Sequence, residues 1–362
     1  MIVKEINITN FRNLKNTKVH LSPSLNIFKG ENAQGKTNLL ETLYICAIGK
    51  SPRLNKIKDC ITWGKNFSII KIVVLKKFSQ VEIDFRILDN NKKIILINKV
   101  PIKSLSDLLG ELKIVYFFPE DLKLIKESPA DRRKFMDIDL SQTSKSYFVH
   151  LKKYNLILAE RNKLLKQCKT IDAVNQTINI WNEQLAVSAS EIIFERIKFL
   201  EKLSPLVMNA HREISGNEQV LNISYVGECG ETKDEIKSKL LQLYNQTLEK
   251  DFSLGYTTIG PHKDDIKIDL DGIDIRIFGS QGQQRTASLA LKFAEINLFE
   301  KEFGEPPILL LDDVLSELDE SRQNHLIQMS KKCQTILTCT NLIKTDNDFN
   351  IFNIKQGEIT KI

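Results

Sequence analysis

The sequence predicts an α/β protein into which an α-helical domain is inserted. Residues 25–29 form a short apolar stretch that runs into a glycine-rich loop and then into helical spacing over 37–47. Residues 308–311 are wholly apolar, as in a strand buried within a parallel sheet. Between Gly110 and Gly216 glycine disappears, and Leu, Ile, Ala, Lys and Glu recur at helical spacing. We therefore expect one domain from 1–120 and 251–362, with a helical arm over 121–250 inserted into it.

The first 120 residues carry mainly strand patterns. Residues 2–9 alternate between apolar and polar side chains, which indicates a first strand. Segments 68–75, 81–88 and 92–98 are rich in β-branched residues and resemble the strands of a meander. A further strand is predicted over 114–118, where Pro119 stops it.

Helical patterns dominate the middle of the chain, and strands return after residue 250. The stretches 131–168 and 171–213 predict two extended helices packed on each other, and 231–250 predicts another. Residues 221–226 have a strand pattern. Strands are predicted over 266–270 and 273–277, because Asp271-Gly272 between them is a strong hairpin turn. A helix is expected from about 282 to 301.

Composition and the first residues together predict a soluble, cytoplasmic protein. The chain has 362 residues, of which 42% are hydrophobic and 27% charged, and it shows no apolar run near the ~20 residues that span a bilayer. The first residues lack the layout of a signal peptide. Six cysteines never approach CxxC spacing, which argues against a zinc site or a disulfide framework.

Positive charge is concentrated at the N-terminal end. Residues 1–120 contain 20 Lys and Arg against 10 Asp and Glu, a net charge of +10, whereas residues 251–362 contain 12 against 18, a net charge of −6. A basic third of a chain favours a polyanionic partner such as DNA or RNA. The alternative is a lysine-rich, solvated surface with no partner.

Residues 30–37 match the P-loop pattern G-x-x-x-x-G-K-[ST] in full. Glycines allow backbone N–H groups to curl around phosphates, the lysine reaches the β- and γ-phosphates, and the threonine hydroxyl binds Mg²⁺. The following helix directs its positive end at the same anion. Because a strand precedes the loop and a helix follows it, we predict a nucleoside triphosphate site. Its residues are Gly30, Glu31, Asn32, Ala33, Gln34, Gly35, Lys36 and Thr37.

The apolar strand at 308–311 ends in two acids, as in a Walker B motif. Asp312 would hold Mg²⁺ together with Thr37, directly or through water. Asp313 would orient or deprotonate the attacking water. Two acids after an apolar run are also a common end of a strand, and the P-loop is what favours the catalytic interpretation.

A polar, glycine-containing segment opens a helix 32 positions before Asp312. Ser280, Gly282 and Gln283 in the string SQGQQR could present a hydroxyl and backbone N–H groups to a phosphate. The competing interpretation is a simple helix cap at Ser280.

The order of these three motifs, followed by SELD over 316–319, resembles the ABC-type ATPase heads, and the helical insertion resembles their SMC-related branch. Further strings resemble the RecF family: NFRN at 10–13, FPEDL at 118–122, SPADRR at 128–133 and GPHKDD at 260–265. Together they cover essentially the whole chain in the right order.

The resemblance implies an ABC-type ATPase head, a P-loop α/β lobe plus antiparallel β structure, with an inserted helical arm. In such proteins two heads enclose ATP in an ATP-dependent homodimer. Ser280 and Gly282 would contact the γ-phosphate of the other head, Asp319 would communicate between heads, and Arg12 would contact the adenine or ribose side. Ser280 would thus act with Lys36, Asp312 and Asp313 in catalysis.

The same resemblance implies a function in recombinational repair and replication-fork maintenance. The dimer would bind double-stranded and gapped or junction DNA and help load RecA recombinase, with RecO and RecR as partners. ATP hydrolysis would be weak, DNA-stimulated and used for release.

Two departures from the ATPase pattern stand out. Asp313 stands where these heads usually have glutamate, and its shorter side chain suggests slow hydrolysis. No glutamine follows the predicted strand at 114–118, where Pro119-Glu120 occupies the place of the Q-loop.

Other functions and assignments compete with this one. One alternative is the ATPase subunit of a membrane transporter, but the P-loop and the signature are usually closer in such proteins than the 243 positions (280 − 37) found here. The other alternative is a nuclease built on an ABC-type head, but the sequence after Asp313 has no further acidic cluster with metal-binding spacing. Basic residues over 51–58 could contact a DNA backbone or be a solvated loop. Arg132 and Arg133 are expected to pair with acids such as Asp137 or Asp139. His262 has no second histidine nearby, so we expect it to be structural.

Overall fold

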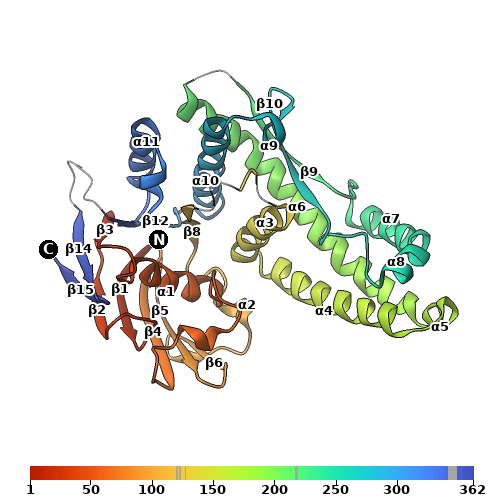
Figure 1. Ribbon diagram of the computed structural model, residues 1–362, viewed down its shortest axis with the longest axis horizontal. Helices are drawn as coiled ribbons and strands as arrows, with labels where there is room; N and C mark the ends of the chain where they lie inside the picture. Colours follow the sequence, from red (N-terminus) through yellow and green to blue (C-terminus); the bar gives the residue numbers. More distant parts are fainter. Residues whose placement is uncertain (120, 122–123, 127, 217–218, 341–348) are drawn as a thin grey trace. The chain divides into compact units, whose positions relative to one another are not determined.

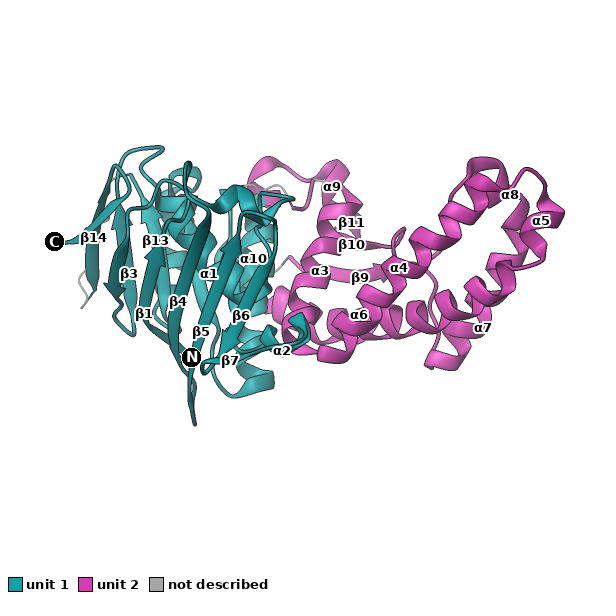
Figure 2. Ribbon diagram, turned by 90° about the horizontal axis from the view of Figure 1, so that it is seen from below, with its two compact units in different colours: residues 1–123, 210–217, 285–362 teal, residues 124–209, 218–284 magenta. Residues whose placement is uncertain are grey.

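The computed structural model describes the chain except residues 120, 122–123, 127, 217–218 and 341–348. It forms two compact units, which Figure 2 colours teal and magenta. The first unit contains 1–123, 210–217 and 285–362, and the second contains 124–209 and 218–284. Residues 251–284 thus lie with the helical arm, whereas the sequence suggested that they belong to the α/β domain. In the described part of the chain, no helix combines the length and apolarity needed to cross a membrane.

A six-stranded, mainly parallel sheet is central to the first unit. Its strand order is β15-β14-β3-β13-β12-β8, and only β15 runs antiparallel to its neighbour. All five residues of β12 are buried, which is why its sequence is apolar from Ile308 to Leu311, before it ends in Asp312. The strands are β3 Leu25–Lys29, β8 Ile114–Phe117, β12 Ile308–Asp312, β13 Thr335–Cys339, β14 Asn350–Lys355 and β15 Glu358–Lys361. Because parallel strands share a direction, the carboxyl ends of β3, β13, β12 and β8 meet at one edge.

An antiparallel sheet forms the other layer of the first unit. Its order is β2-β1-β4-β5-β6-β7, and the expected meander is present as β4, β5 and β6. Burial alternates along β4, as expected for a strand with one face on the core. The strands are β1 Ile2–Thr9, β2 Thr17–His20, β4 Phe67–Leu75, β5 Gln80–Leu88, β6 Lys93–Ile97 and β7 Val100–Pro101.

Helix α1, Lys36–Ile48, lies between the two sheets. It contacts β12, β13 and β8 of the parallel sheet and β4 of the antiparallel sheet. Most of its side chains are therefore buried on all sides, which is typical of a helix enclosed in a core. The other helical segments described in this unit are η1 Ile57–Cys60, α2 Leu105–Leu108, η3 Val314–Glu317 and α11 Glu320–Ser330. Helix α10, Gln281–Phe303, is labelled in Figure 1. It begins in the second unit and continues into the first.

Helices make up most of the second unit. They are α3 Pro129–Thr143, α4 Lys145–Gln167, α5 Ile171–Asn175, α6 Ile178–Ser215, α7 Lys233–Gln246, α8 Leu248–Leu254 and α9 Ile275–Phe278. The last residues of α6, from 210 to 215, group with the first unit. The single helix expected over 131–168 is in fact two, because Ser144 leaves helical geometry and its hydroxyl accepts from Tyr147 N–H to cap α4. The second expected helix is likewise divided into α5 and α6. The predicted helix at 231–250 is divided at Thr247.

A small antiparallel sheet, β11-β10-β9, completes the second unit. Strand β9, Leu221–Val226, occupies the predicted residues and pairs with β10, Asp265–Leu270. The turn after β10 has positive φ at Asp271 and Gly272, as its sequence predicted. The predicted strand at 273–277 was too long: β11 is only Ile273–Asp274, because Asp274 caps α9 by accepting from Arg276 N–H. The pairing with β9 also explains why these residues group with the arm.

Candidate nucleotide-binding site

The P-loop leaves β3 and enters α1 at the common edge of the parallel sheet. Gly35 is the N-cap of α1 at φ 115°, a left-handed conformation that favours glycine. No side chain caps this end of the helix. The first N–H groups of α1 therefore remain suited to an anion, which the helix dipole also favours.

Backbone and side-chain contacts hold the loop in this shape. A Cβ on Gly30 would lie 2.4 Å from the Ile354 carbonyl oxygen, so only glycine fits there. Gln34 accepts from Gly357 N–H through its carbonyl (3.1 Å) and from Gln356 N–H through Oε1 (2.5 Å). The Ala33 carbonyl accepts from Asn13 Nδ2 at 3.1 Å. The side chains left exposed at the tip are those of Glu31, Asn32 and Ala33.

Lys36 lies across the loop. Its Nζ donates to the Gly30 carbonyl oxygen at 2.7 Å, and the side chain is almost fully buried. The ammonium group is thus fixed inside the loop, next to the N–H groups at the start of α1. This is the arrangement of donors that a di- or triphosphate requires.

Thr37 and Asp312 meet although 275 residues separate them. Thr37 Oγ1 donates to Asp312 Oδ1 at 2.9 Å, and Thr338 Oγ1 on β13 donates to the same oxygen at 2.9 Å. Tyr116 OH on β8 donates to Asp312 Oδ2 at 3.3 Å. The carboxyl ends of β8, β12 and β13 therefore converge on one acid beside the P-loop.

Burial controls the protonation of this cluster. It raises the pKa of Asp312, against the three hydroxyl donors that stabilise the carboxylate. Burial also raises the pKa of Tyr116 well above its usual range, and the neighbouring Asp312 adds to this. Tyr116 therefore stays a neutral donor. A cation bound at Asp312 would favour the carboxylate further.

Asp313 has a different environment from Asp312. Its backbone is left-handed, with φ 53°, and its N–H lies within hydrogen-bonding distance of both the carbonyl oxygen (3.2 Å) and Oγ1 (3.0 Å) of Thr338. Ser316 Oγ donates to the Asp313 carbonyl at 2.7 Å. Asp312 is buried and hydrogen-bonded, whereas Asp313 is partly exposed. Adjacent acids in such different settings suit different tasks.

Arg12 is anchored to α1 by a buried acid that the sequence did not single out. Arg12 Nη2 lies 3.0 Å from Glu41 Oε1, and Arg53 contacts the other oxygen at 2.5 Å. Burial raises the pKa of Glu41, but hydrogen bonds from Ser51 and Arg12 and the charge of Arg53 outweigh it and lower the pKa overall.

A pocket of about 590 Å³ lies on this side of the P-loop unit. Arg12 lines it together with Lys58, Gly64 and Lys65. Trp63 lines it as well, and 93% of this residue is exposed. A fully exposed tryptophan beside cationic side chains offers a flat surface for a planar ligand. Trp63 belongs to no recognisable sequence motif, so the sequence did not identify it as a binding residue.

The signature segment belongs to the second unit, at the start of α10. Ser280 N–H donates to Gln283 Oε1 at 2.9 Å, and Gln283 N–H donates to Ser280 Oγ at 3.2 Å. The reciprocal pair is a capping box, so Ser280 caps α10. Ser280 is nevertheless exposed, and Gly282 is half-buried.

After Asp313 the chain forms η3 and then α11, which Asp319 caps by accepting from Arg322 N–H at 3.0 Å. Arg322 also donates to Thr286 Oγ1 on α10 at 2.8 Å. Arg285 donates to the Glu317 carbonyl at 2.8 Å. Within the first unit, α10 is therefore tied directly to the segment that follows the acidic pair. The place expected for the Q-loop includes Glu120, which lies outside the described residues.

The two arginines at the start of α3 bind other partners than the sequence predicted. Arg132 forms a two-point contact with Asp265 (2.6 and 2.9 Å), and Arg133 donates to the Asp264 carbonyl at 2.7 Å. Sequence proximity suggested Asp137 or Asp139 instead. Pairing across α3 and β10 connects distant segments that share the core of the second unit.

Comparison with known proteins agrees with this architecture. The family model described as "RecF/RecN/SMC N terminal domain" matches residues 2–359. The DNA replication and repair proteins RecF of Clostridium botulinum and Clostridium tetani are each 43% identical to the chain, over 100% and 99% of both sequences.

Solved structures give the same result. The chain superimposes on the recombination mediator RecF of the RecFOR pathway bound to an ATP analogue, with a TM-score of 0.93, 36% identity and coverage of 100% of this chain and 98% of the other. A head of Smc bound to a domain of ScpA shares the fold, with a TM-score of 0.56 at 16% identity and coverage of 100% and 97%. The ABC-type head fold is thus established, and the chain belongs to the RecF family of DNA replication and repair proteins within the RecF/RecN/SMC group.

Proposed function

We propose that this protein is an ATP-switched DNA-binding protein of recombinational repair and replication-fork maintenance. The observation that carries the proposal is the convergence of Lys36, Thr37 and Asp312 at the edge of the parallel sheet. This cluster combines the ammonium group of Lys36, which can bind phosphate, with the side-chain oxygen atoms of Thr37 and Asp312, which can bind a metal ion. Relatives with this fold include a RecF structure containing ATP.

The residues present fit Mg²⁺ and ATP. Thr37 Oγ1 and Asp312 Oδ1, 2.9 Å apart, are a hydroxyl and a carboxylate, the hard oxygen donors that Mg²⁺ prefers. Lys36 can exchange the Gly30 carbonyl for phosphate oxygens at little cost, since its ammonium group is already held in the loop. When bound, Mg²⁺ would neutralise phosphate charge. Asp313 would orient or deprotonate the attacking water, slowly because of its short side chain.

The pocket at Arg12 is the proposed base side of the nucleotide. Trp63 offers an aromatic face on which a purine can stack, and Arg12 adds a cation next to it. Arg12 is not free to move, because Glu41 fixes its guanidinium. Helix α1 would thus contribute to both parts of the site, because Lys36 at its start would bind phosphate and Glu41 positions Arg12.

The proposed switch is an ATP-dependent homodimer. Ser280, Gly282 and Gln283 of one protomer would complete the phosphate site of the other by presenting the start of α10. The exposed hydroxyl of Ser280 and the half-buried Gly282 support this role, since both remain accessible while the capping box is formed. Hydrolysis then separates the heads.

The proposed object of the switch is double-stranded and gapped or junction DNA. The +10 charge of residues 1–120 supports a polyanionic partner. Relatives are described as DNA replication and repair proteins and as a mediator in the RecFOR pathway. We infer that RecO and RecR are partners and that the chain helps to load RecA, with weak, DNA-stimulated ATP hydrolysis for release.

Substitution of Ser280 tests the shared site. Ser280→Arg places a bulky cation at the start of α10, so ATP should still bind to monomers while ATP-dependent dimerisation is lost. Light scattering after size-exclusion chromatography, with a fluorescent ATP analogue for affinity, measures both. Ser79→Arg, on the exposed turn between β4 and β5, is the matched control and should dimerise normally. A Ser280→Arg protein that dimerises with ATP as the wild type does would refute the shared site.

A further inference from the structure

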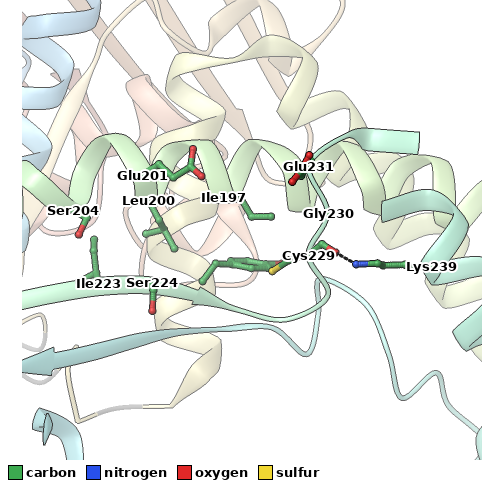
Figure 3. A pocket seen from close by; sticks show the side chains of 11 residues that line it. Ile197, Leu200, Glu201, Ser204, Ile223, Ser224, Cys229, Gly230, Glu231 and Lys239 are labelled. Carbon is green, nitrogen blue, oxygen red and sulfur yellow. Dashed lines mark hydrogen bonds between the residues drawn. The ribbon is translucent and has the colours of Figure 1, made fainter. Parts of the chain in front are cut away.

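A groove of about 620 Å³ lies in the second unit, and no residue assigned to the nucleotide site lines it. Figure 3 shows its lining: one face of α6, the strand β9, and the segment that leads from β9 to α7. The apolar side chains that line it are those of Ile197, Leu200 and Ile223. None of the functions proposed above uses this groove.

Strand β9 presents an edge to the groove as well as a face. A strand that shows only one face to a cavity contributes every second residue. Here three consecutive residues, Ile223, Ser224 and Tyr225, line the cavity. The groove therefore reaches the backbone of β9.

The hydrogen-bonding pattern shows which backbone groups lie at this edge. Asp271 N–H donates to the Val220 carbonyl at 3.0 Å, which makes the two residues a hydrogen-bonded pair of the β9–β10 ladder. Such pairs alternate along antiparallel strands, so Asn222 and Ser224 bond to β10, whereas Ile223 and Tyr225 direct their N–H and C=O groups away from it. In the described part of the chain, β9 pairs with no strand on that second side.

Helix α6 provides the opposite wall. Ile197, Leu200, Glu201 and Ser204 follow the spacing of one helix face. At 1.5 Å per residue this stripe is about 10 Å long, which matches about three residues of extended chain. The groove thus has the dimensions and the donors for a short strand.

The charged residues of the lining favour a ligand that carries a basic side chain. Glu201 and Glu231 line it, and neither carboxylate forms an ion pair among the residues described. Lys239 is the cation of the lining, and its Nζ is engaged by the Cys229 carbonyl at 2.7 Å. A basic side chain on the occupant would complement the two acids.

We propose that this groove binds an extended peptide segment of a partner protein, which adds to β9 as an antiparallel or parallel strand. The peptide would carry apolar side chains at alternate positions, directed onto α6, and a lysine or arginine near Glu201 or Glu231. Backbone hydrogen bonds to Ile223 and Tyr225 would supply affinity, and the apolar stripe would supply specificity. This binding goes beyond the ATP switch and does not depend on it.

The probes for the test are capped nine-residue peptides that alternate valine and threonine. One set ends in lysine at both ends and a matched set ends in glutamate. Fluorescence anisotropy with the full chain should show saturable binding of the lysine set, at least tenfold tighter than the glutamate set. Glu201→Lys together with Glu231→Lys should reverse this order. No saturable binding by either set, or an unchanged order, would overturn the proposal.

Hydrogen exchange of single amides tests the strand addition directly. The bound peptide should slow exchange at Ile223 and Tyr225, while Asn222 and Ser224, already bonded to β10, should change little. Ser204→Arg should obstruct the groove and weaken binding at least tenfold, and Asn209→Arg, exposed farther along α6, is the matched control. Peptide binding that protects all four amides equally, or that survives Ser204→Arg, would mean that the peptide does not pair with β9.

Discussion

The hydrogen bond from Lys36 to Gly30 is the contact that phosphates would replace. Lys36→Met keeps the length of the side chain but removes all three donors and the charge. Hydrogen bonds to charged groups contribute about 1.5–3 kcal/mol, so ATP affinity should fall by roughly 10- to 150-fold. Titration with a fluorescent ATP analogue measures the loss, and thermal unfolding without nucleotide checks that the fold is retained. ATP affinity within about twofold of wild type would exclude Lys36 as a phosphate ligand.

Substitution of Asp313 tests ATP hydrolysis separately from ATP binding. Asp313→Asn keeps the shape of the left-handed turn but removes the basic oxygen, so single-turnover ATP hydrolysis should fall by about 100-fold or more. ATP affinity should be unchanged, because among the described residues no hydrogen bond joins the Asp313 side chain to Thr37 or Asp312. Asp234→Asn, on the exposed start of α7, is the control for loss of one charge. Hydrolysis at the wild-type rate would place the general base elsewhere.

At the residue scale, sequence predicted what depends on neighbours in the chain. The P-loop is a local motif, so its residues could be identified without a fold. Tyr116 and Thr338 could not, because they meet Asp312 from 196 and 26 positions away. Their strands were recognisable, but the strand order that brings their ends together is not encoded in any short string.

At the scale of elements, the GPHKDD segment shows how a turn fastens helices together. His262 Nε2 lies 3.0 Å from the Thr257 carbonyl, and Nδ1 lies 2.6 Å from Tyr154 OH on α4. Since a carbonyl can only accept, Nε2 carries the proton and Nδ1 accepts from the tyrosine. Both nitrogens of the neutral ring are thus used, as expected for a structural histidine. Arg196 on α6 donates to the Pro261 carbonyl at 2.7 Å and fastens the same turn.

This arrangement predicts a pH-dependent effect of substitution at His262. Burial lowers the pKa of His262 from 6.5 to about 4, so unfolded chains bind a proton that the folded state rejects. The stability contributed by neutral His262 is complete above pH 6.5 and is lost as the pH falls toward 4. The free-energy cost of His262→Asn in urea unfolding should therefore shrink by about 2–3 kcal/mol between about pH 7.5 and 4.5. A cost that does not depend on pH would show that the ring is not buried in neutral form.

A neighbouring acid works in the opposite direction and is the internal control. Burial raises the pKa of Asp264 from 3.8 to about 6, so this carboxyl favours the folded state increasingly as the pH falls through that range. In wild type the two effects partly cancel. The difference between His262→Asn and wild type isolates the histidine, since Asp264 is common to both.

Element types were predictable from periodicity, and element boundaries were not. The meander strands and β9 follow from alternating or β-branched residues. The break between α3 and α4 was missed because Ser144 stands in an otherwise helical pattern and its hydroxyl prefers the cap. Likewise Asp274 ends β11 by capping α9, an outcome that side-chain geometry decides.

At the scale of the whole molecule, the chain ends share one sheet. Strand β3 lies between β13 and β14, so the P-loop strand pairs with segments 310 (335 − 25) and 324 (350 − 26) positions later. The sequence predicted that the head combines both ends because the motifs are split between them. It did not predict that 251–284 would group with the arm, because that depends on the pairing of β10 with β9.

The positive charge of residues 1–120 leads to a prediction about how the whole molecule binds DNA. Binding to gapped DNA should be stronger with ATP, since two heads then present two basic surfaces to one polyanion. Each phosphate that a lysine or arginine neutralises adds about 0.9 to the slope of log affinity against log salt. Two or more such contacts should lower affinity at least about tenfold between roughly 50 and 200 mM salt, as measured by fluorescence anisotropy.

Single lysines then locate the DNA surface. Lys56 and Lys58 are exposed, Lys56 at the N-cap of η1 and Lys58 within η1. If they contact phosphates, Lys56→Ala and Lys58→Ala should each reduce the salt slope by about 1 and weaken binding to all DNA sequences alike. Lys250→Ala, exposed on α8 in the other unit, is the control for charge alone and should leave the slope unchanged. Affinity that responds to neither ATP nor salt would contradict the switch, because a protein that grips DNA through its phosphate backbone must release counterions when it binds.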